Sequence, residues 1–278
     1  MESITPTHWE EKSVALDGVK IRYHRTGGNR PPLVLIHGFT DNGLCWTRVA
    51  KALEAEYDII MPDMRGHGHS VSNKVIFSTD TLADDVAELI HSLNLSKPIV
   101  MGHSMGGQTA TILAAKYPEL ASKIVLEDPA YRLKTKRRKI LNYIIGFALV
   151  LMIQSRINKT EEKIRNGCKR RNPRWHEDEI FPWAKAQKEF GRKESINLVK
   201  NMKERVRVNW CEIFPKISTP TLLVIPAHGM LKLKDAQEIL PKFPNNNARI
   251  AFVEKAGHSV RRYNFPAYMK AIRSFFNE

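Results

Sequence analysis

VMGHSMGG, residues 100–107, joins a short apolar run to a helical pattern. Ser104 lies at its centre between Gly102 and Gly106, in the pattern G-x-S-x-G. A serine at a tight turn from a strand to a helix needs small neighbours, because larger side chains would collide with adjacent strands. The N-terminus of the following helix, expected over 108–116, adds partial positive charge. We therefore predict that Ser104 is a nucleophile; a glycine-rich turn without chemistry is the alternative.

Strands and helices alternate on both sides of this turn. Four apolar runs resemble strands that are buried on both faces of a parallel sheet: PLVLIHG at 32–38, YDIIMPD at 57–63, KPIVMGH at 97–103 and SKIVLED at 122–128. Asp17-Gly18 predicts the turn of an antiparallel hairpin before them. After residue 211 the alternation resumes with PTLLVIP at 220–226 and ARIAFVE at 248–254. Together these features predict an α/β fold with a mostly parallel sheet flanked by helices.

Helices with one apolar face are expected at three places in this alternation. The first covers residues 81–93, the second lies near 234–241, and the last contains Tyr268, Ile272 and Phe275 on one side. Each follows a predicted strand or a turn, as a helix that covers a sheet does.

Residues 131–211 interrupt the alternation with helical stretches and no strand signal. The chain has a formal net charge of +15, and residues 131–210 hold 22 of its 44 Lys and Arg residues but only 8 of its 29 Asp and Glu residues. We predict a strongly basic α-helical cap, inserted after the strand that ends at Asp128. The core then consists of residues 1–130 and 212–278. Such a cap would lie over the carboxyl edge of the sheet, where α/β proteins bind ligands.

Three interpretations of the basic cap are open, and we give them in order of preference. The apolar run 143–153 is shorter than the roughly 20 residues that span a bilayer, so it can instead roof an apolar substrate pocket. Basic residues beside an apolar run are also typical of a helix that makes weak peripheral contact with an anionic membrane. Nucleic-acid binding through CKRRNPRW at 168–175 ranks last, because no known motif is present. We predict no nucleic-acid partner.

Four motifs together resemble the α/β-hydrolase superfamily, particularly its capped carboxylesterase and lipase-like members. They are HGF at 37–39, PDMRGHGHS at 62–70, GHSMGG at 102–107 and AGHSVRR at 256–262. The resemblance covers nearly the whole chain outside the predicted cap. It implies that His258 is the catalytic base and that the backbone N–H groups of Phe39 and Met105 form an oxyanion hole. Asp63 and Arg65 are expected to brace the loop beside the nucleophile.

The acid of the triad is missing from the place that the resemblance implies. In similar proteins it often follows the strand that corresponds to PTLLVIP, and Gly229 occupies that place here. The superfamily also uses the end of the strand after the nucleophile helix, which here is Asp128. A carboxylate there can reach the same histidine, because triad roles depend on geometry rather than on chain position. We predict Asp128 as the acid; its alternative role is to cap a turn before Pro129.

Two other carboxylates lie near these positions. Glu127 precedes Asp128, but side chains alternate along a strand, so only one of the pair can face the site. Asp235 is the nearest carboxylate downstream of Gly229 and is the alternative acid. It falls where a helix begins, and an N-cap role explains it more simply.

The sequence therefore predicts a cytoplasmic serine hydrolase that cleaves carboxylic esters with short to medium acyl groups. Its substrate is a small molecule, and no cofactor is expected. Cys45, Cys168 and Cys211 are widely spaced and odd in number, so no metal is expected either. The N-terminus has no apolar core of the signal-peptide type. Alternatives are a lactonase or carbon–carbon bond hydrolase with the same triad, or a noncatalytic small-molecule binding protein with a degenerate triad. The oligomeric state is not predicted.

Overall fold

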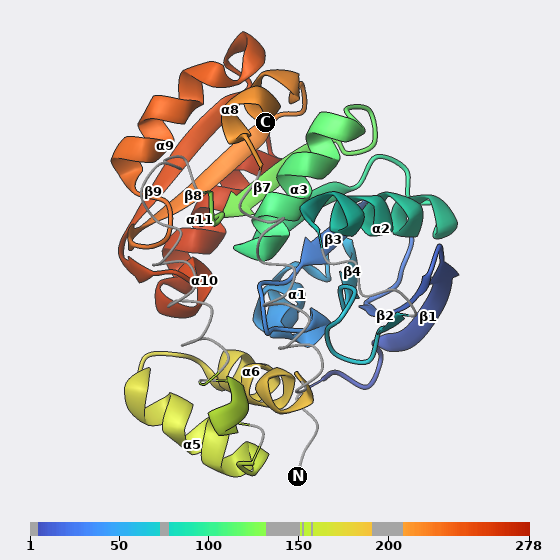
Figure 1. Ribbon diagram of the computed structural model, residues 1–278, viewed down its shortest axis with the longest axis vertical. Coiled ribbons are helices and arrows are strands. Elements are labelled where there is room, and N and C mark those ends of the chain that lie inside the picture. The colour runs from blue at the N-terminus through green and yellow to red at the C-terminus, as the bar shows by residue number, and fades with distance from the viewer. Residues whose placement is uncertain (1–4, 73–77, 132–150, 152, 157, 191–207) are drawn as a thin grey trace.

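The computed structural model describes residues 5–72, 78–131, 151, 153–156, 158–190 and 208–278 (Figure 1). In this described part, a nine-stranded sheet has the order β1-β2-β4-β3-β6-β7-β8-β9, and β5 pairs with β2. The strands are β1 (Glu10–Leu16), β2 (Val19–Arg25), β3 (Pro32–Ile36), β4 (Asp58–Pro62), β5 (Val71–Ser72), β6 (Ile99–His103), β7 (Lys123–Glu127), β8 (Thr221–His228) and β9 (Ala248–Gly257). From β4 through β9 in this order all neighbours are parallel, which confirms the predicted sheet.

The antiparallel part of the sheet begins with the predicted hairpin. Leu16 of β1 faces Val19 of β2, so the turn consists of Asp17 and Gly18 alone. Gly18 has a φ of 68°, a left-handed conformation that glycine adopts without steric cost. β2 then pairs antiparallel with β4 and joins the hairpin to the parallel strands.

Helices cover both faces of the sheet. The α-helices are α1 (Thr47–Leu53), α2 (Thr79–Ser92), α3 (Met105–Lys116), α5 (Glu161–Arg171), α6 (Glu177–Glu189), α8 (Trp210–Ile213), α9 (Leu233–Ile239), α10 (Val260–Tyr263) and α11 (Phe265–Phe276). A 3₁₀ turn, η1 (Gly43–Trp46), precedes α1. Helices α2, α3 and α9 contribute to the hydrophobic core on one face of the sheet, and α1 and α11 contribute to the core on the other.

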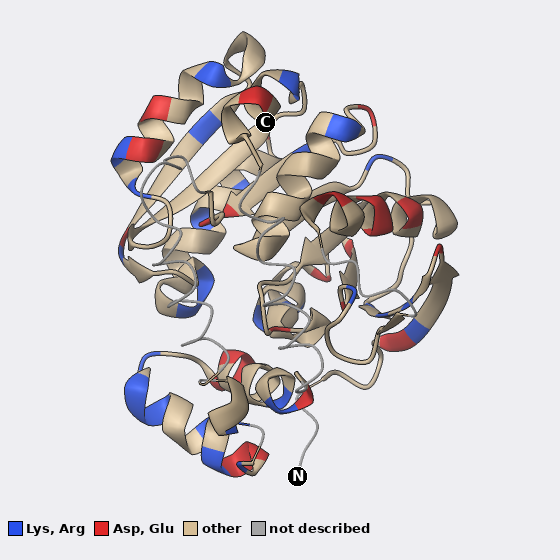
Figure 2. Cartoon of the chain, viewed as in Figure 1, with Lys and Arg blue, Asp and Glu red and all other residues tan. Residues whose placement is uncertain are grey.

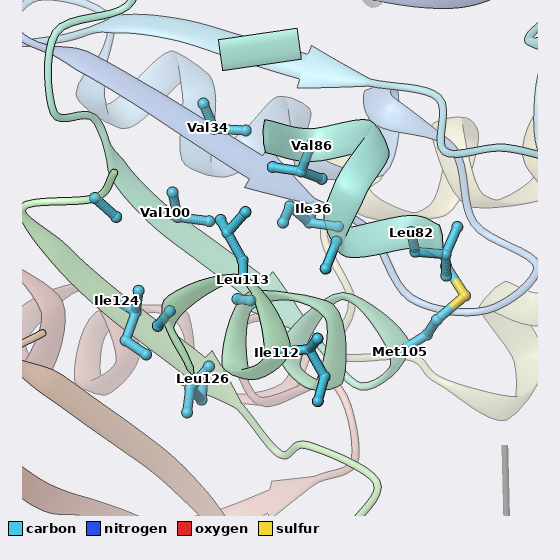
Figure 3. Close-up of a cluster of buried hydrophobic side chains, with 14 of the residues drawn as sticks. Val34, Ile36, Leu82, Val86, Val100, Met105, Ile112, Leu113, Ile124 and Leu126 are labelled. Carbon is cyan, nitrogen blue, oxygen red and sulfur yellow. The ribbon is translucent and has the colours of Figure 1, made fainter. Parts of the chain in front are cut away.

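Alternate residues of the central strands supply these two cores, because successive strand side chains point to opposite faces. Val34 and Ile36 of β3 pack toward α2 and α3 (Figure 3). Leu33 and Leu35 of the same strand belong to the core that contains α1 and α11. All four side chains are fully buried. Full burial of an aliphatic side chain contributes about 1.5–3 kcal/mol, so β3 anchors both layers beside the loop that carries Phe39.

The predicted helices are present with shifted ends. α2 begins at Thr79 because the Ser78 hydroxyl accepts a hydrogen bond from the Thr81 N–H at 3.0 Å. α3 begins at Met105, three residues earlier than expected, directly after the nucleophile. The N-cap role expected for Asp235 is wrong. Lys232 is the N-cap of α9, and Asp235 lies inside its first turn.

Between β7 and β8, the described residues include α5 and α6, which lie side by side at one end of the molecule (Figure 1). α6 contacts α1 and η1 of the core. The last turn of α5 carries Lys169, Arg170 and Arg171, and Figure 2 shows basic residues in blue on this helix. Most of the apolar run 143–153 lies outside the described residues. The limits of the cap and its contact with a membrane stay predictions. No helix in the described part of the chain is long and apolar enough to cross a bilayer.

Candidate active site

Ser104 occupies a strained turn between β6 and α3. Its φ of 54° and ψ of −106° are unusual for a residue with a side chain, and such strain is a feature of nucleophiles at strand-to-helix turns. The flanking glycines make the turn possible. A Cβ atom at Gly102 would lie 2.1 Å from the Gly106 carbonyl oxygen, and one at Gly106 would lie 2.2 Å from the Ile36 carbonyl oxygen. The Ser104 N–H donates to the Glu127 carbonyl at 2.9 Å, which ties the turn to β7.

His258 lies between Ser104 and Asp128. It follows β9, and its Nε2 atom is 3.0 Å from Ser104 Oγ. Its Nδ1 atom is 2.6 Å from Asp128 Oδ2. The structure thus brings together the three residues that the sequence predicts as a triad. A nucleophile within hydrogen-bond reach of a base, which a third group orients, is the arrangement that activates a serine hydroxyl.

Asp128 is fully buried at the end of β7. Besides His258, its carboxylate accepts the N–H groups of Met230 at 2.8 Å and Leu231 at 2.9 Å. The side chain therefore fixes a turn, as the alternative interpretation expected, but that turn follows β8 rather than β7. One carboxylate performs both tasks, since its two oxygens together accept several hydrogen bonds.

Residue 229, where similar proteins often carry the acid, has no room for a side chain in this protein. A Cβ atom at Gly229 would lie 2.4 Å from Asp128 Oδ2 and 2.4 Å from Pro226 Cγ. The carboxylate of Asp128 fills the space that a side chain at residue 229 would need. Asp235, the alternative acid, lies in the first turn of α9, whereas the hydrogen bond to His258 Nδ1 comes from Asp128.

The two residues predicted for the oxyanion hole lie at the ends of neighbouring strands. Phe39 follows β3, Met105 is the first residue of α3 after β6, and β3 pairs directly with β6. The first N–H groups of a helix have no acceptor within the helix, so that of Met105 is suited to bind an anion. The Phe39 ring meets Phe190, which follows α6, edge-on with 5.1 Å between ring centroids. The oxyanion role of the Phe39 and Met105 N–H groups stays a prediction.

The motif PDMRGHGHS braces the loops beside this site. Asp63 is fully buried and accepts the Gly43 N–H at 2.9 Å and the His69 N–H at 2.9 Å. Arg65 pairs with Asp85 of α2 at 2.6 Å. These contacts agree with the expected bracing by Asp63 and Arg65.

His103 is a member of the site that sequence reasoning missed. Its ring centroid lies 4.8 Å from that of His258, and its Nε2 atom is 3.1 Å from the His258 carbonyl oxygen. Burial lowers the pKa of His103 well below the ordinary value, with a further contribution from Arg261. A neutral ring can donate Nε2–H to that carbonyl and hold the backbone of His258. Its position inside GHSMGG was the only sequence signal.

Comparisons with known proteins identify the fold. A family model described as the alpha/beta hydrolase fold matches residues 31–149. The solved structure of E-2-(acetamidomethylene)succinate hydrolase superposes with a TM-score of 0.81 over 98% of this chain and 100% of that one, at 20% identity. The protein has the α/β-hydrolase fold. Its fold and its similarity to esterases and lipases, expected from the four motifs, are thereby confirmed.

Two relatives of this α/β-hydrolase match along most of their lengths. One is a Haemophilus influenzae protein whose name places it among esterases and lipases; the two are 26% identical over 90% of this chain and 84% of that protein. The other is N-formylmaleamate deformylase of Pseudomonas putida, which is 23% identical over 95% of this chain and 96% of that protein. Among the described residues of this α/β-hydrolase, no group of His, Cys, Asp and Glu side chains is arranged to hold a metal ion.

Proposed function

We propose that this α/β-hydrolase is a serine hydrolase that cleaves carboxylic esters with short to medium acyl groups. The observation that carries the proposal is the position of His258, 3.0 Å from Ser104 Oγ and 2.6 Å from Asp128 Oδ2. A nonenzymatic role would not need a strained serine aimed at a histidine whose other nitrogen pairs with a buried carboxylate.

Acylation begins with attack of Ser104 Oγ on the ester carbonyl carbon. His258 Nε2 accepts the hydroxyl proton as the bond forms, and Asp128 stabilises the resulting imidazolium. The backbone N–H groups of Phe39 and Met105 bind the negative oxygen of the tetrahedral intermediate. His258 then delivers the proton to the leaving alkoxide, and the acyl-enzyme forms.

Deacylation repeats these steps with water as the nucleophile. His258 accepts a proton from water, the hydroxide attacks the acyl carbon, and Ser104 leaves with the proton that His258 returns. The carboxylic acid is released and the enzyme returns to its initial state. No cofactor takes part in this sequence of steps.

Some similar proteins are named for reactions on other acyl compounds, so such compounds belong among the substrates tested. One solved structure with a TM-score of 0.74 and 21% identity is an enol-lactonase from Burkholderia xenovorans. A lactone is a cyclic ester, so the same attack by Ser104 would open it. Carbon–carbon bond hydrolysis on the same triad is a further alternative. A substrate panel should therefore contain linear esters, lactones and a β-diketone.

The experiment combines fluorophosphonate labelling with hydrolysis of p-nitrophenyl butyrate. Wild type is expected to label and turn over, whereas Ser104→Ala should do neither. Ser122→Ala is the matched control, because Ser122 is an exposed serine on the loop before β7. Absence of both labelling and turnover in folded wild type would contradict the proposal and favour a noncatalytic small-molecule binding protein.

A further inference from the structure

A buried cluster of charged side chains includes two residues that closely follow His258 in the sequence. We call it the arginine cluster: it consists of Asp41, Glu127, Glu179, Arg261 and Arg262, each at most 4% exposed. Arg261 Nη1 is 2.6 Å from Glu127 Oε2, and the Arg261 N–H donates to Glu127 Oε1 at 3.0 Å. Glu127 therefore fixes the backbone only three residues after His258. Glu127 also directly precedes Asp128, and its carbonyl accepts the Ser104 N–H at 2.9 Å, so both partners of His258 are connected to Glu127.

Arg262 extends the cluster to two further parts of the molecule. Its Nη2 atom is 2.9 Å from Asp41 Oδ2, and its Nε atom is 3.2 Å from Glu179 Oε2. Asp41 lies in the loop that also carries Phe39. Glu179 lies in α6, the helix between β7 and β8, and its Oε2 atom is also 3.9 Å from Arg261 Nε. Glu179 thus connects the predicted cap with both arginines.

Burial makes these contacts interdependent. Charges removed from water are tolerated only while they are paired, and loss of one partner leaves the others uncompensated. Burial raises the pKa of Glu179, whereas Arg261 and Arg262 oppose that effect. The Arg262 guanidinium also lies 5.1 Å from the ring centroid of Trp175, on the segment between α5 and α6. The segment 175–179 therefore supplies one negative charge and one aromatic face to the arginine cluster.

We propose that Glu179 is a positioning residue, through which helix α6 holds the His258 loop in register with Ser104. The inference rests on the proposed serine-hydrolase function and adds to it. Glu179 does not touch the reacting atoms; it acts through Arg261 and Arg262. Removal of its charge should let α10 shift, and His258 would then lose its alignment. Misplacement of a reacting group by about 1 Å can cost about 100-fold in rate.

Two other roles for α6 give different kinetics. If α6 only roofs the substrate pocket, loss of Glu179 raises KM and leaves kcat unchanged. If Glu179 only stabilises the fold, the folded variant keeps the wild-type kcat at 25 °C. A positioning role lowers kcat, and with it the rate of fluorophosphonate labelling of Ser104, because both depend on His258.

Glu179→Gln is the test variant, since it keeps the shape of the side chain and removes its charge. Asp178→Asn is the matched control. Asp178 is the preceding residue of α6 and also bridges to the core, through Lys51 at 2.8 Å, but it lies outside the arginine cluster. We expect Glu179→Gln to lower kcat for p-nitrophenyl butyrate by about 10- to 100-fold with KM within threefold of wild type, and Asp178→Asn to stay within twofold in both.

A second variant keeps the test decisive if Glu179→Gln folds poorly. Glu179→Asp keeps the negative charge of the cluster, so it should fold better than Glu179→Gln, while its shorter side chain draws the carboxylate away from Arg261 and Arg262. The inference expects folded Glu179→Asp to keep the wild-type KM while kcat falls. A wild-type kcat in folded Glu179→Asp or in folded Glu179→Gln would overturn it. Ser104→Ala, assayed in parallel, separates these outcomes from failure of the proposed function, in which wild type itself would show no turnover.

Discussion

The ends of β7 and β8 lie side by side in the sheet, but one supplies hydrogen-bond acceptors to the candidate site and the other supplies donors. β7 ends at the buried carboxylate of Glu127, and a second buried carboxylate, Asp128, follows directly. The turn after β8 contributes only backbone N–H groups, from Met230 and Leu231, and the space left by Gly229. Each end supplies what the other lacks. In this protein the carboxylate comes from the end of the neighbouring strand, and the turn after β8 binds it.

The two carboxylates of β7 also differ from each other. Glu127 pairs with Arg261, and Asp128 pairs with His258. Glu127 is the last residue of β7, whereas Asp128 follows the strand with a φ of 39°, and the two side chains meet different partners on the same short segment after β9. We therefore interpret Glu127 as the residue that holds this segment and Asp128 as the one that orients the base.

Glu127→Gln should have the largest effect on folding. It leaves the fully buried Arg261 without its closest charge partner, and loss of one member of a buried ion pair costs about 3–5 kcal/mol. Urea denaturation followed by circular dichroism measures the change. Glu119→Gln is the control, because the side chain of Glu119 is 87% exposed and should cost less than about 1 kcal/mol. Similar losses for both variants would contradict the interpretation that Glu127 holds the segment after β9.

Gly229→Asp should destabilise the protein by about 1–3 kcal/mol, the usual cost of overpacking. The new Cβ atom would lie 2.4 Å from Asp128 Oδ2, and two carboxylates would compete for the same space. We expect lower hydrolysis of p-nitrophenyl butyrate and a lower melting temperature.

The double variant Asp128→Gly/Gly229→Asp sharpens this test, because it removes the clash and returns a carboxylate to the end of β8. It should be more active than Asp128→Gly alone. An unchanged melting temperature in Gly229→Asp would contradict the idea that the two positions share one space.

Acidification should weaken the fold through buried histidines, including His37 and His103 at neighbouring strand ends. Burial, with a further contribution from Arg22, lowers the pKa of His24 to about 4. The unfolded histidine has a pKa of about 6.5, so below that pH the unfolded chain binds a proton that the folded chain does not. Stability is therefore lost as the pH falls from about 6.5 toward 4, by up to about 1.4 kcal/mol per pH unit for each such histidine.

Urea denaturation at pH 7.5, 6.0 and 5.0 measures this dependence. His24→Gln is the control. It removes one histidine that takes up a proton on unfolding, so the free energy of unfolding should change less with pH, by up to about 1.4 kcal/mol per pH unit. A free energy of unfolding that stays constant or rises on acidification would show that these rings are protonated in the folded protein.

Asp235→Asn should have the smallest effect. Asp235 lies in the first turn of α9, where loss of a favourable interaction with the helix dipole costs about 0.3–1 kcal/mol. We expect kcat/KM within twofold of wild type. A large loss of activity with an intact fold would instead assign the acid of the triad to Asp235, in the region after β8.

Much of this site could be predicted because it lies in local motifs. G-x-S-x-G identifies Ser104, and the strand that ends at Asp128 can be located from its apolar run. His103 and Glu179 could not be found in this way. Glu179 meets Arg262 across 83 residues of sequence, and neither residue belongs to a motif that predicts the pair. Similarly, the sequence shows that Gly229 lacks a carboxylate, but only the structure shows that Asp128 fills the space beside it.

The most direct test of the relocated acid is the rate of Ser104 acylation in Asp128→Asn, measured by stopped-flow burst kinetics with p-nitrophenyl butyrate. Asparagine preserves the shape of the side chain but cannot stabilise the imidazolium of His258. The account predicts a loss of about 10⁴-fold relative to wild type, with the fold retained by circular dichroism. An acylation rate within tenfold of wild type would contradict the assignment of Asp128 as the acid of the triad.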